Sequence, residues 1–208
     1  MSTIPNEQQC IDILKDHGAP DRLIKHVCTV TALAVAVARR CGADQDLIIA
    51  GGLLHDLGRT RTHGVRHGLE GEALARSLGL PEPLVLIIRR HIGSGILPKE
   101  ARTLGLPDLD YVPRTLEEKI VCHADNLVSD ADYLTSDAAY RDFLRKGLTG
   151  PADRMLEMHK ELSERCGADI DSIADEIRGA EPRGPCGRYL KMHISSWSGP
   201  SGDQVRRS

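Results

Sequence analysis

The chain has 208 residues, with 27 Lys and Arg against 30 Asp and Glu, which gives a formal net charge of -3 at pH 7. This balance excludes the basic surface that general nucleic-acid binding requires, and an aromatic content of 3% leaves little material for stacking bases. The length predicts one domain with an appendage and an aliphatic core.

Helix start and stop signals recur along the chain, with a side-chain hydrogen-bond acceptor before each apolar stretch and a glycine after it. The pattern predicts helices, in chain order, over residues 21–41, 44–58, 67–78, 81 or 82–91, 98–104, 115–129, 137–147, 151–166 and 171–178. Thr115 and Glu118 predict a capping box at the start of the sixth helix. Because strand signals are nearly absent, the expected fold class is all-α.

Two features concern the connections between these helices. The sequence Arg-Cys-Gly-Ala-Asp occurs at 40–44 and again at 165–169, which we interpret as one helix-end and N-cap pattern used twice. The stretch 93–114 carries three prolines and is long for a connection, which indicates a lid. We expect a helical body over 1–180 and a mobile Gly/Pro/Ser-rich tail over 181–208, of which 189–194 could dock on the body.

The six cysteines form no Cys-x-x-Cys pair, which argues against a zinc knuckle or a dithiol redox site. We therefore expect reduced, mostly buried thiols. The N-terminus lacks a basic segment followed by an apolar one, and the longest apolar run, Leu47–Leu54, is too short to span a bilayer. A cytoplasmic protein with no membrane span is the resulting expectation.

Ionisable side chains fall on the apolar faces of several predicted helices, namely His26, His67, His91 and Asp125. A carboxylate in an aliphatic row is costly unless something compensates its charge. His55 and Asp56 end the most apolar helix, where the carboxylate can share one ion with His55 while its second oxygen reaches another. The set predicts a metal site in the core, with a purely structural hydrogen-bond network as the alternative.

The order His26, then His55-Asp56, then Asp125 resembles the H…HD…D signature of the HD-domain superfamily, and Leu54–Gly58 resembles its HDIG variant. His67 and His91 are similar in position to the two extra histidines of members with a dinuclear site. Residues 118–126 resemble the final helix of small stand-alone members such as bacterial diadenosine tetraphosphate hydrolases. The resemblance covers about residues 21–130.

This resemblance implies an HD-type helical bundle with two divalent ions, for which Fe, Mn, Co or Zn all suit the ligand types. The first ion would be held by His26, His55, Asp56 and Asp125, and the second by His67 and His91 with Asp56 bridging. Arg59 stands where many members carry Lys and is expected to contact phosphate, so that Asp56 and Arg59 are the expected catalytic residues.

The expected activity is hydrolysis of a phosphoester or phosphoanhydride, in which the ions lower the pKa of a water toward about 7. The expected partner is a small phosphorylated metabolite or nucleotide, such as a cyclic phosphate or a dinucleoside polyphosphate. The resemblance also admits an HD-type di-iron oxygenase, and a non-catalytic metal-binding or sensory module remains a third reading. The sequence leaves the oligomeric state open.

Other polar residues near these positions have weaker signals. The sequence gives His63 two roles of equal weight, a residue of the site or a solvent-exposed residue. His123 faces away from Asp125 and is predicted to pack in the interior. His17, His159 and His193 are predicted to be solvent residues. A phosphate clamp is conceivable for the remaining arginines nearby, but surface charge is the better interpretation of each one: Arg61, Arg66, Arg89 and Arg90.

Overall fold

A computed structural model describes residues 3–179 and 185–187 of the chain. The helices are α1 (Glu7–Asp16), α2 (Asp21–Cys41), α3 (Gln45–Leu54), the 3-10 helix η1 (Leu57–Thr60), α4 (His67–Ser77), α5 (Glu82–Arg90), α6 (Pro98–Thr103), α7 (Leu116–Asn126), α8 (Ser136–Arg145), α9 (Thr149–Cys166) and α10 (Ile170–Ile177). The strands β1 (Val128–Ser129) and β2 (Asp132–Tyr133) pair as a short antiparallel hairpin. The predicted all-α fold class is confirmed.

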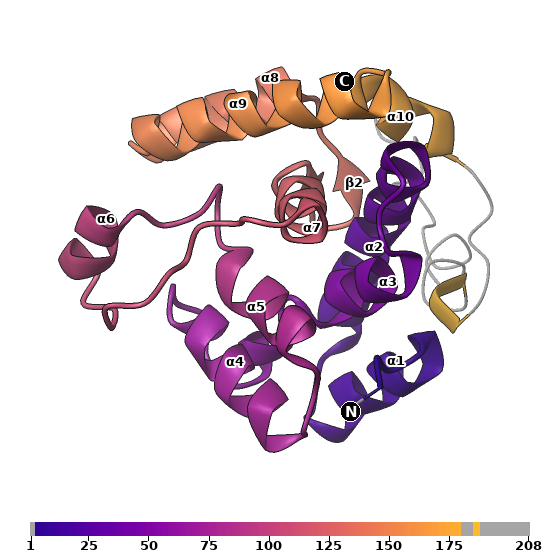
Figure 1. Cartoon of the computed structure of the whole chain (residues 1–208), viewed down its shortest axis with the longest axis vertical. Helices are drawn as coiled ribbons and strands as arrows, with labels where there is room; N and C mark the ends of the chain where they lie inside the picture. The colour runs from indigo at the N-terminus through magenta and orange to yellow at the C-terminus, as the bar shows by residue number, and fades with distance from the viewer. Residues whose placement is uncertain (1–2, 180–184, 188–208) are drawn as a thin grey trace, which may run out of the picture.

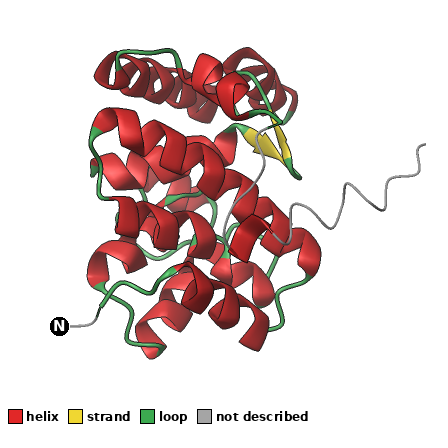
Figure 2. Cartoon of the chain, turned by 90° about the vertical axis from the view of Figure 1, so that its right-hand side faces the viewer, coloured by secondary structure: helices red, strands yellow, loops and turns green. Residues whose placement is uncertain are grey.

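The core lies where α2, α3, α5 and α7 pack on one another. Its fully buried side chains are aliphatic and come from all four helices, including Leu33, Ile48, Ile88 and Ile120. Helices α8, α9 and α10 lie together along one end of the bundle (Figure 1), and the β1–β2 hairpin sits beside this layer (Figure 2). None of the described helices is long and apolar enough to cross a bilayer.

Glycines allow the elements that carry the histidines to approach closely. A Cβ on Gly52 of α3 would lie 2.6 Å from Thr31 Oγ1 of α2. A Cβ on Gly58 of η1 would lie 1.9 Å from the carbonyl oxygen of His67 at the start of α4. The two helix contacts therefore require glycine, and they hold the His55-Asp56 turn against both neighbours.

Most predicted helices agree with the structure within a few residues, but two end earlier than expected. The helix predicted over 44–58 ends at Leu54, and the chain turns at His55-Asp56 before η1 begins. The helix predicted over 115–129 ends at Asn126, because the next residues enter the hairpin. The capping box is only half formed: the Thr115 side chain accepts from the Glu118 amide, whereas the Glu118 carboxylate binds Arg90 instead.

The repeated Arg-Cys-Gly-Ala-Asp pattern acts as predicted. Gly42 and Gly167 take left-handed conformations, with φ of 73° and 65°, directly after α2 and α9. Asp44 and Asp169 then cap α3 and α10 through their side chains. The expectation of reduced thiols is wrong for four cysteines. Cys41 is bonded to Cys166 because the ends of α2 and α9 lie together, and Cys28, inside α2, is bonded to Cys186. Cys10 and Cys122 are free and buried.

We expect the variant with Cys41→Ser and Cys166→Ser to be less stable than the parent by about 3–5 kcal/mol, because this cross-link closes a long loop in the unfolded chain. Thermal unfolding of both proteins without reductant measures the difference. With reductant present the difference should largely disappear, since the parent then loses the same bond. A double variant as stable as the oxidised parent would contradict the stabilising role.

The segment 93–114, predicted to be a lid, is a structured connection between α5 and α7. It contains α6 and a bridge between Ile96 and Tyr111, and it has a small apolar cluster of its own. Arg154 of α9 binds the Gly95 carbonyl oxygen and Glu100, which ties the segment to the α8–α9 layer. Of the predicted tail over 181–208, only residues 185–187 are described, so the expected mobility and the docking of 189–194 lie outside the described residues.

Candidate metal centre

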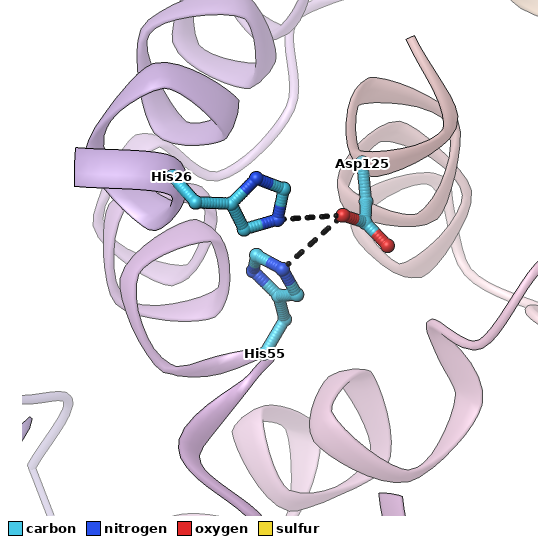
Figure 3. A group of neighbouring side chains, drawn as sticks. All are labelled: His26, His55 and Asp125. Carbon is cyan, nitrogen blue, oxygen red and sulfur yellow. Dashed lines mark hydrogen bonds and ion pairs between the residues drawn. The ribbon is translucent and has the colours of Figure 1, made fainter. Parts of the chain in front are cut away.

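The six predicted ligands come from five helices and meet in the interior of the bundle. His26 lies in the second turn of α2, and Asp125 in the last turn of α7. His55 and Asp56 directly follow α3, His67 opens α4, and His91 directly follows α5. Figure 3 shows the His26 and His55 rings side by side, both directed at one oxygen of the Asp125 carboxylate on the helix across from them. Helix periodicity predicted an inward direction for four of these side chains, and the helix end placed His55 and Asp56; the structure brings all six together.

Asp56 stands between two groups of imidazole nitrogens. Its Oδ1 lies 3.2 Å from His67 Nε2 and 3.3 Å from His91 Nε2. Its Oδ2 lies 3.7 Å from both His26 Nε2 and His55 Nε2. Asp125 Oδ1 completes the second group at 3.0 Å from His26 Nε2 and 3.4 Å from His55 Nε2. The Asp56 carboxylate therefore faces both groups of imidazoles, with one oxygen directed at each group.

The backbone fixes which nitrogen of each imidazole faces the centre. The four Nδ1 atoms lie within 3.2 Å of carbonyl oxygens, those of Asp130, Gly52, Gly64 and Ile88 for His26, His55, His67 and His91 respectively. A carbonyl oxygen only accepts, so Nδ1 carries the proton and Nε2 of the neutral ring presents a lone pair. Four lone pairs and two carboxylates thus point at one another.

This arrangement lacks the donors that it needs. His67 Nε2 and His91 Nε2 lie 2.9 Å apart, and two lone pairs at that distance repel unless a proton or a cation lies between them. His55 Nε2 and Asp56 Oδ1 are buried and have no hydrogen-bond partner in the described part of the chain. Buried polar atoms are normally satisfied. The cluster therefore has the electrostatic character of a cation site.

The pKa values of the cluster show the same demand for positive charge. Burial disfavours protonation of His55, but Asp125 and Asp56 outweigh it and raise the pKa of His55 to about 9. Burial likewise favours neutral Asp56, but His55, His67 and His91 hold its pKa well below the ordinary value. Burial lowers the pKa of His91. Because a metal ligand must present a lone pair, a cation and a proton compete for His55 Nε2.

These residues fit divalent metal ions. Two sets of side chains each place their ligand atoms within 4.8 Å of one another: His26, His55 and Asp125, and His55, Asp56 and His91. Imidazole nitrogen and carboxylate oxygen without thiolate suit Fe, Mn, Co and Zn. A metal-bound histidine usually donates its other ring N–H to a carbonyl or carboxylate, as the Nδ1 atoms of these imidazoles do.

A cavity of about 690 Å³ opens from this cluster to the surface. His26, Asp56 and Asp125 form part of its lining, together with Arg59 and the exposed His63. Arg59 Nε lies 2.6 Å from Asp56 Oδ2, which fixes the guanidinium at the edge of the cluster. The segment 94–114 does not border this cavity, so the predicted lid lies elsewhere.

Other predicted roles resolve differently. Arg90, expected at the surface, is buried and binds Glu118 and Asp110, while Arg89 binds Glu72. Arg61 and Arg66 are exposed, as expected.

His123 is buried as predicted and lies 3.0 Å from His159, which is also buried rather than solvent-facing. Burial lowers the pKa of His123 to about 3. His17 is half-buried, and His193 lies outside the described residues.

Two cavity residues were missed by the sequence reasoning. Asn126 donates from Nδ2 to the Gly93 carbonyl oxygen at 2.8 Å, beside Asp125. Arg22 lies four residues before His26 on α2 and lines the same cavity. A spacing of four places two residues on one helix face, and this signal was available for Arg22.

The chain belongs to the HD domain family, whose sequence profile matches residues 23–130. Its fold is similar to that of the HD domain of the L. monocytogenes phosphodiesterase PgpH. The structure in complex with cyclic-di-AMP has a TM-score of 0.55 at 18% identity, over 83% of this chain and 99% of that one. A second structure of the same domain has a TM-score of 0.53 at 19% identity, over 80% and 97% of the two chains. At this identity the likeness shows the fold.

Relatives with higher identity carry other names. The chain is 45% identical over 170 residues to a tRNA (cytidine(56)-2'-O)-methyltransferase of Thermoplasma volcanium, covering 82% of this chain and 50% of the relative. An enzyme of the same name from Picrophilus torridus is 42% identical, over 84% and 51% of the two chains. An uncharacterized protein of Methanocaldococcus jannaschii is 47% identical, over 58% and 74%. The chain spans about half the length of the two methyltransferases.

Proposed function

We propose that this protein is a metal-dependent phosphohydrolase that acts on a small phosphorylated metabolite or nucleotide. One observation carries the proposal: Asp56 presents one oxygen to His67 and His91 and the other to His26 and His55, at the floor of an open cavity. A carboxylate that faces two imidazole groups suits two adjacent cations, as in two-metal hydrolytic sites. Membership of the HD family and the fold of a phosphodiesterase support the same reading.

The side chains have distinct parts in this proposal. The six ligands would hold the ions, which would polarise the phosphoryl group and make a water acidic enough to react at neutral pH. Water oxygen forms the new P–O bond, the bond to the leaving oxygen breaks, and the proton released by the water balances the leaving group. Arg59, held by Asp56, is placed to neutralise charge on the phosphoryl oxygens. The backbone carbonyls keep each Nε2 free for binding.

Removal of the metal tests the proposal directly. We expect protein as isolated to contain a transition metal, and chelation to abolish hydrolysis of at least one member of a panel of cyclic and linear phosphoesters. Added Mn²⁺ or Fe²⁺ should restore the activity. Consumption of dioxygen coupled to substrate oxidation would instead establish the oxygenase reading. Metal binding without turnover of any panel member would favour the non-catalytic module.

A second candidate rests on the methyltransferase relatives, of which the chain spans half. In this candidate the HD bundle would work beside an RNA-modifying domain and would bind RNA. The test is fluorescence anisotropy with a tRNA transcript, with and without competing oligonucleotide. Specific binding would support this candidate, and its absence would count against it.

A further inference from the structure

The cavity is much larger than the group that reacts in it. Its volume of about 690 Å³ falls in the range of about 300–1,000 Å³ typical of sites for drug-sized ligands. One wall comes from residues 134–146, which include α8 and follow the segment matched by the HD family profile, 23–130. The part of a substrate that does not react would therefore lie against a wall that the shared family region does not supply.

This wall is apolar at its middle and charged at its edge. Leu134, Ala139 and Phe143 are half-buried or buried and contribute carbon surface to the cavity. Arg145 NH2 lies 3.1 Å from Asp142 Oδ1, and Lys146 Nζ lies 2.6 Å from Asp142 Oδ2. Two cations share one carboxylate, so this edge keeps a net positive charge.

Arg22 of α2 adds a cation to the lining of the same cavity. It is exposed, and within the described residues it has neither a hydrogen bond nor an ion pair with another side chain. It precedes His26 by one helical turn, about 6 Å along the axis. Arg59, in contrast, is already paired with Asp56. Arg22 is thus free to bind an anion in the cavity at a distance from the metal ligands.

From these observations we infer that the substrate carries a second anionic group, which Arg22 binds with the help of Arg145 and Lys146. The substrate class is a nucleotide with a second phosphate separated from the scissile one by an uncharged middle that packs on Phe143 and Leu134. This inference rests on the proposed hydrolase function. Arg22 is a specificity-determining residue in it, and it leaves the reacting phosphoryl group to the metal centre.

The test compares adenosine 3′,5′-bisphosphate with adenosine 3′-monophosphate and adenosine 5′-monophosphate. We expect the parent protein to show a kcat/KM for the bisphosphate at least about 10-fold above that for either monophosphate. Arg22→Ala should lower the bisphosphate value by about 10- to 100-fold, mainly through KM, because a charge-assisted contact to one phosphate is lost. The monophosphate values should change less than about 3-fold.

Arg39→Ala is the matched control, because Arg39 is exposed near the other end of the same helix and does not line the cavity. It should leave all three substrates unchanged. Equal use of the bisphosphate and a monophosphate by the parent, or equal losses in the two variants, would overturn the inference while leaving the hydrolase intact.

Calorimetric binding in EDTA separates the two claims, since the anion contact does not involve the metal ligands. The parent should bind the bisphosphate more tightly than either monophosphate, and Arg22→Ala should remove the difference. If this preference is found without turnover of any phosphoester, the anion site stands and the hydrolase proposal fails. If the parent binds all three nucleotides equally, the anion site is wrong.

Discussion

Replacing Asp56 with Asn should abolish metal retention and phosphoester hydrolysis while leaving the helix content unchanged. Asn keeps the shape of the side chain but removes the negative charge that faces His67 and His91 on one side and His26 and His55 on the other. Loss of a side chain that only hydrogen-bonds to a metal ligand typically costs 10–100-fold in metal affinity, so we expect a loss of at least about 100-fold here. Metal analysis after dialysis, a phosphoester assay and circular dichroism measure the three quantities.

Asp130→Asn is the matched control for this variant. Asp130 is exposed, lines the same cavity, and has a φ of 53°, a conformation that Asn tolerates well. It should retain the parent's metal content and at least half of its activity. Equal metal content in the Asp56→Asn variant and the parent would contradict the bridging role of Asp56, and so would an equal loss in both variants.

Replacing Glu118 with Ala should destabilise the protein by about 3–5 kcal/mol, because it removes the more buried of the two carboxylates that pair with the buried Arg90 guanidinium and leaves only Asp110. Arg90 NH1 lies 2.9 Å and 3.0 Å from the two oxygens of Glu118, whose side chain is only 2% exposed. Glu118 also accepts from the Arg114 amide at 2.7 Å, which joins the 93–114 segment to α7. The expected fall in Tm is about 6–20 °C for a chain of this size.

A double variant distinguishes loss of the ion pair from general damage. Arg90→Met combined with Glu118→Leu removes both charges and should recover a large part of the lost stability, because apolar replacement of a buried pair is often neutral. Arg141→Ala breaks an exposed pair with Asp137 and should leave Tm nearly unchanged. If Glu118→Ala alone unfolds at the parent's Tm, the pair has no stabilising role.

Local patterns predicted that the side chains of the centre gather in the interior, because each one stands on a periodic helix or at a marked helix end, whereas their grouping around two ions came from the family resemblance. The inward direction of Asp125 was inferred from Val121 and Val128 on one predicted helix. Only Val121 lies on α7 with it, because that helix ends at Asn126, and the structure places Asp125 beside His26. That these side chains hold two ions is our proposal, which their placement supports and which metal analysis tests.

Contacts between distant segments could not be predicted in the same way. Arg90 appeared to be a surface residue because its partner Glu118 lies on another helix, and the capping pattern at Thr115 gave Glu118 a different local partner. The pairing of Cys41 with Cys166 depends on the packing of α2 against α9. The β1–β2 hairpin has two residues in each strand, too few for an alternating pattern to emerge.

The bond between Cys41 and Cys166 has a consequence for damage to the backbone. It turns residues 41–166 into a covalent ring, and five of the six clustered His and Asp side chains lie inside that ring. A protease that nicks any one peptide bond between these cysteines would produce two pieces that stay attached. Such a clipped molecule would migrate as one species in denaturing electrophoresis until a thiol is added.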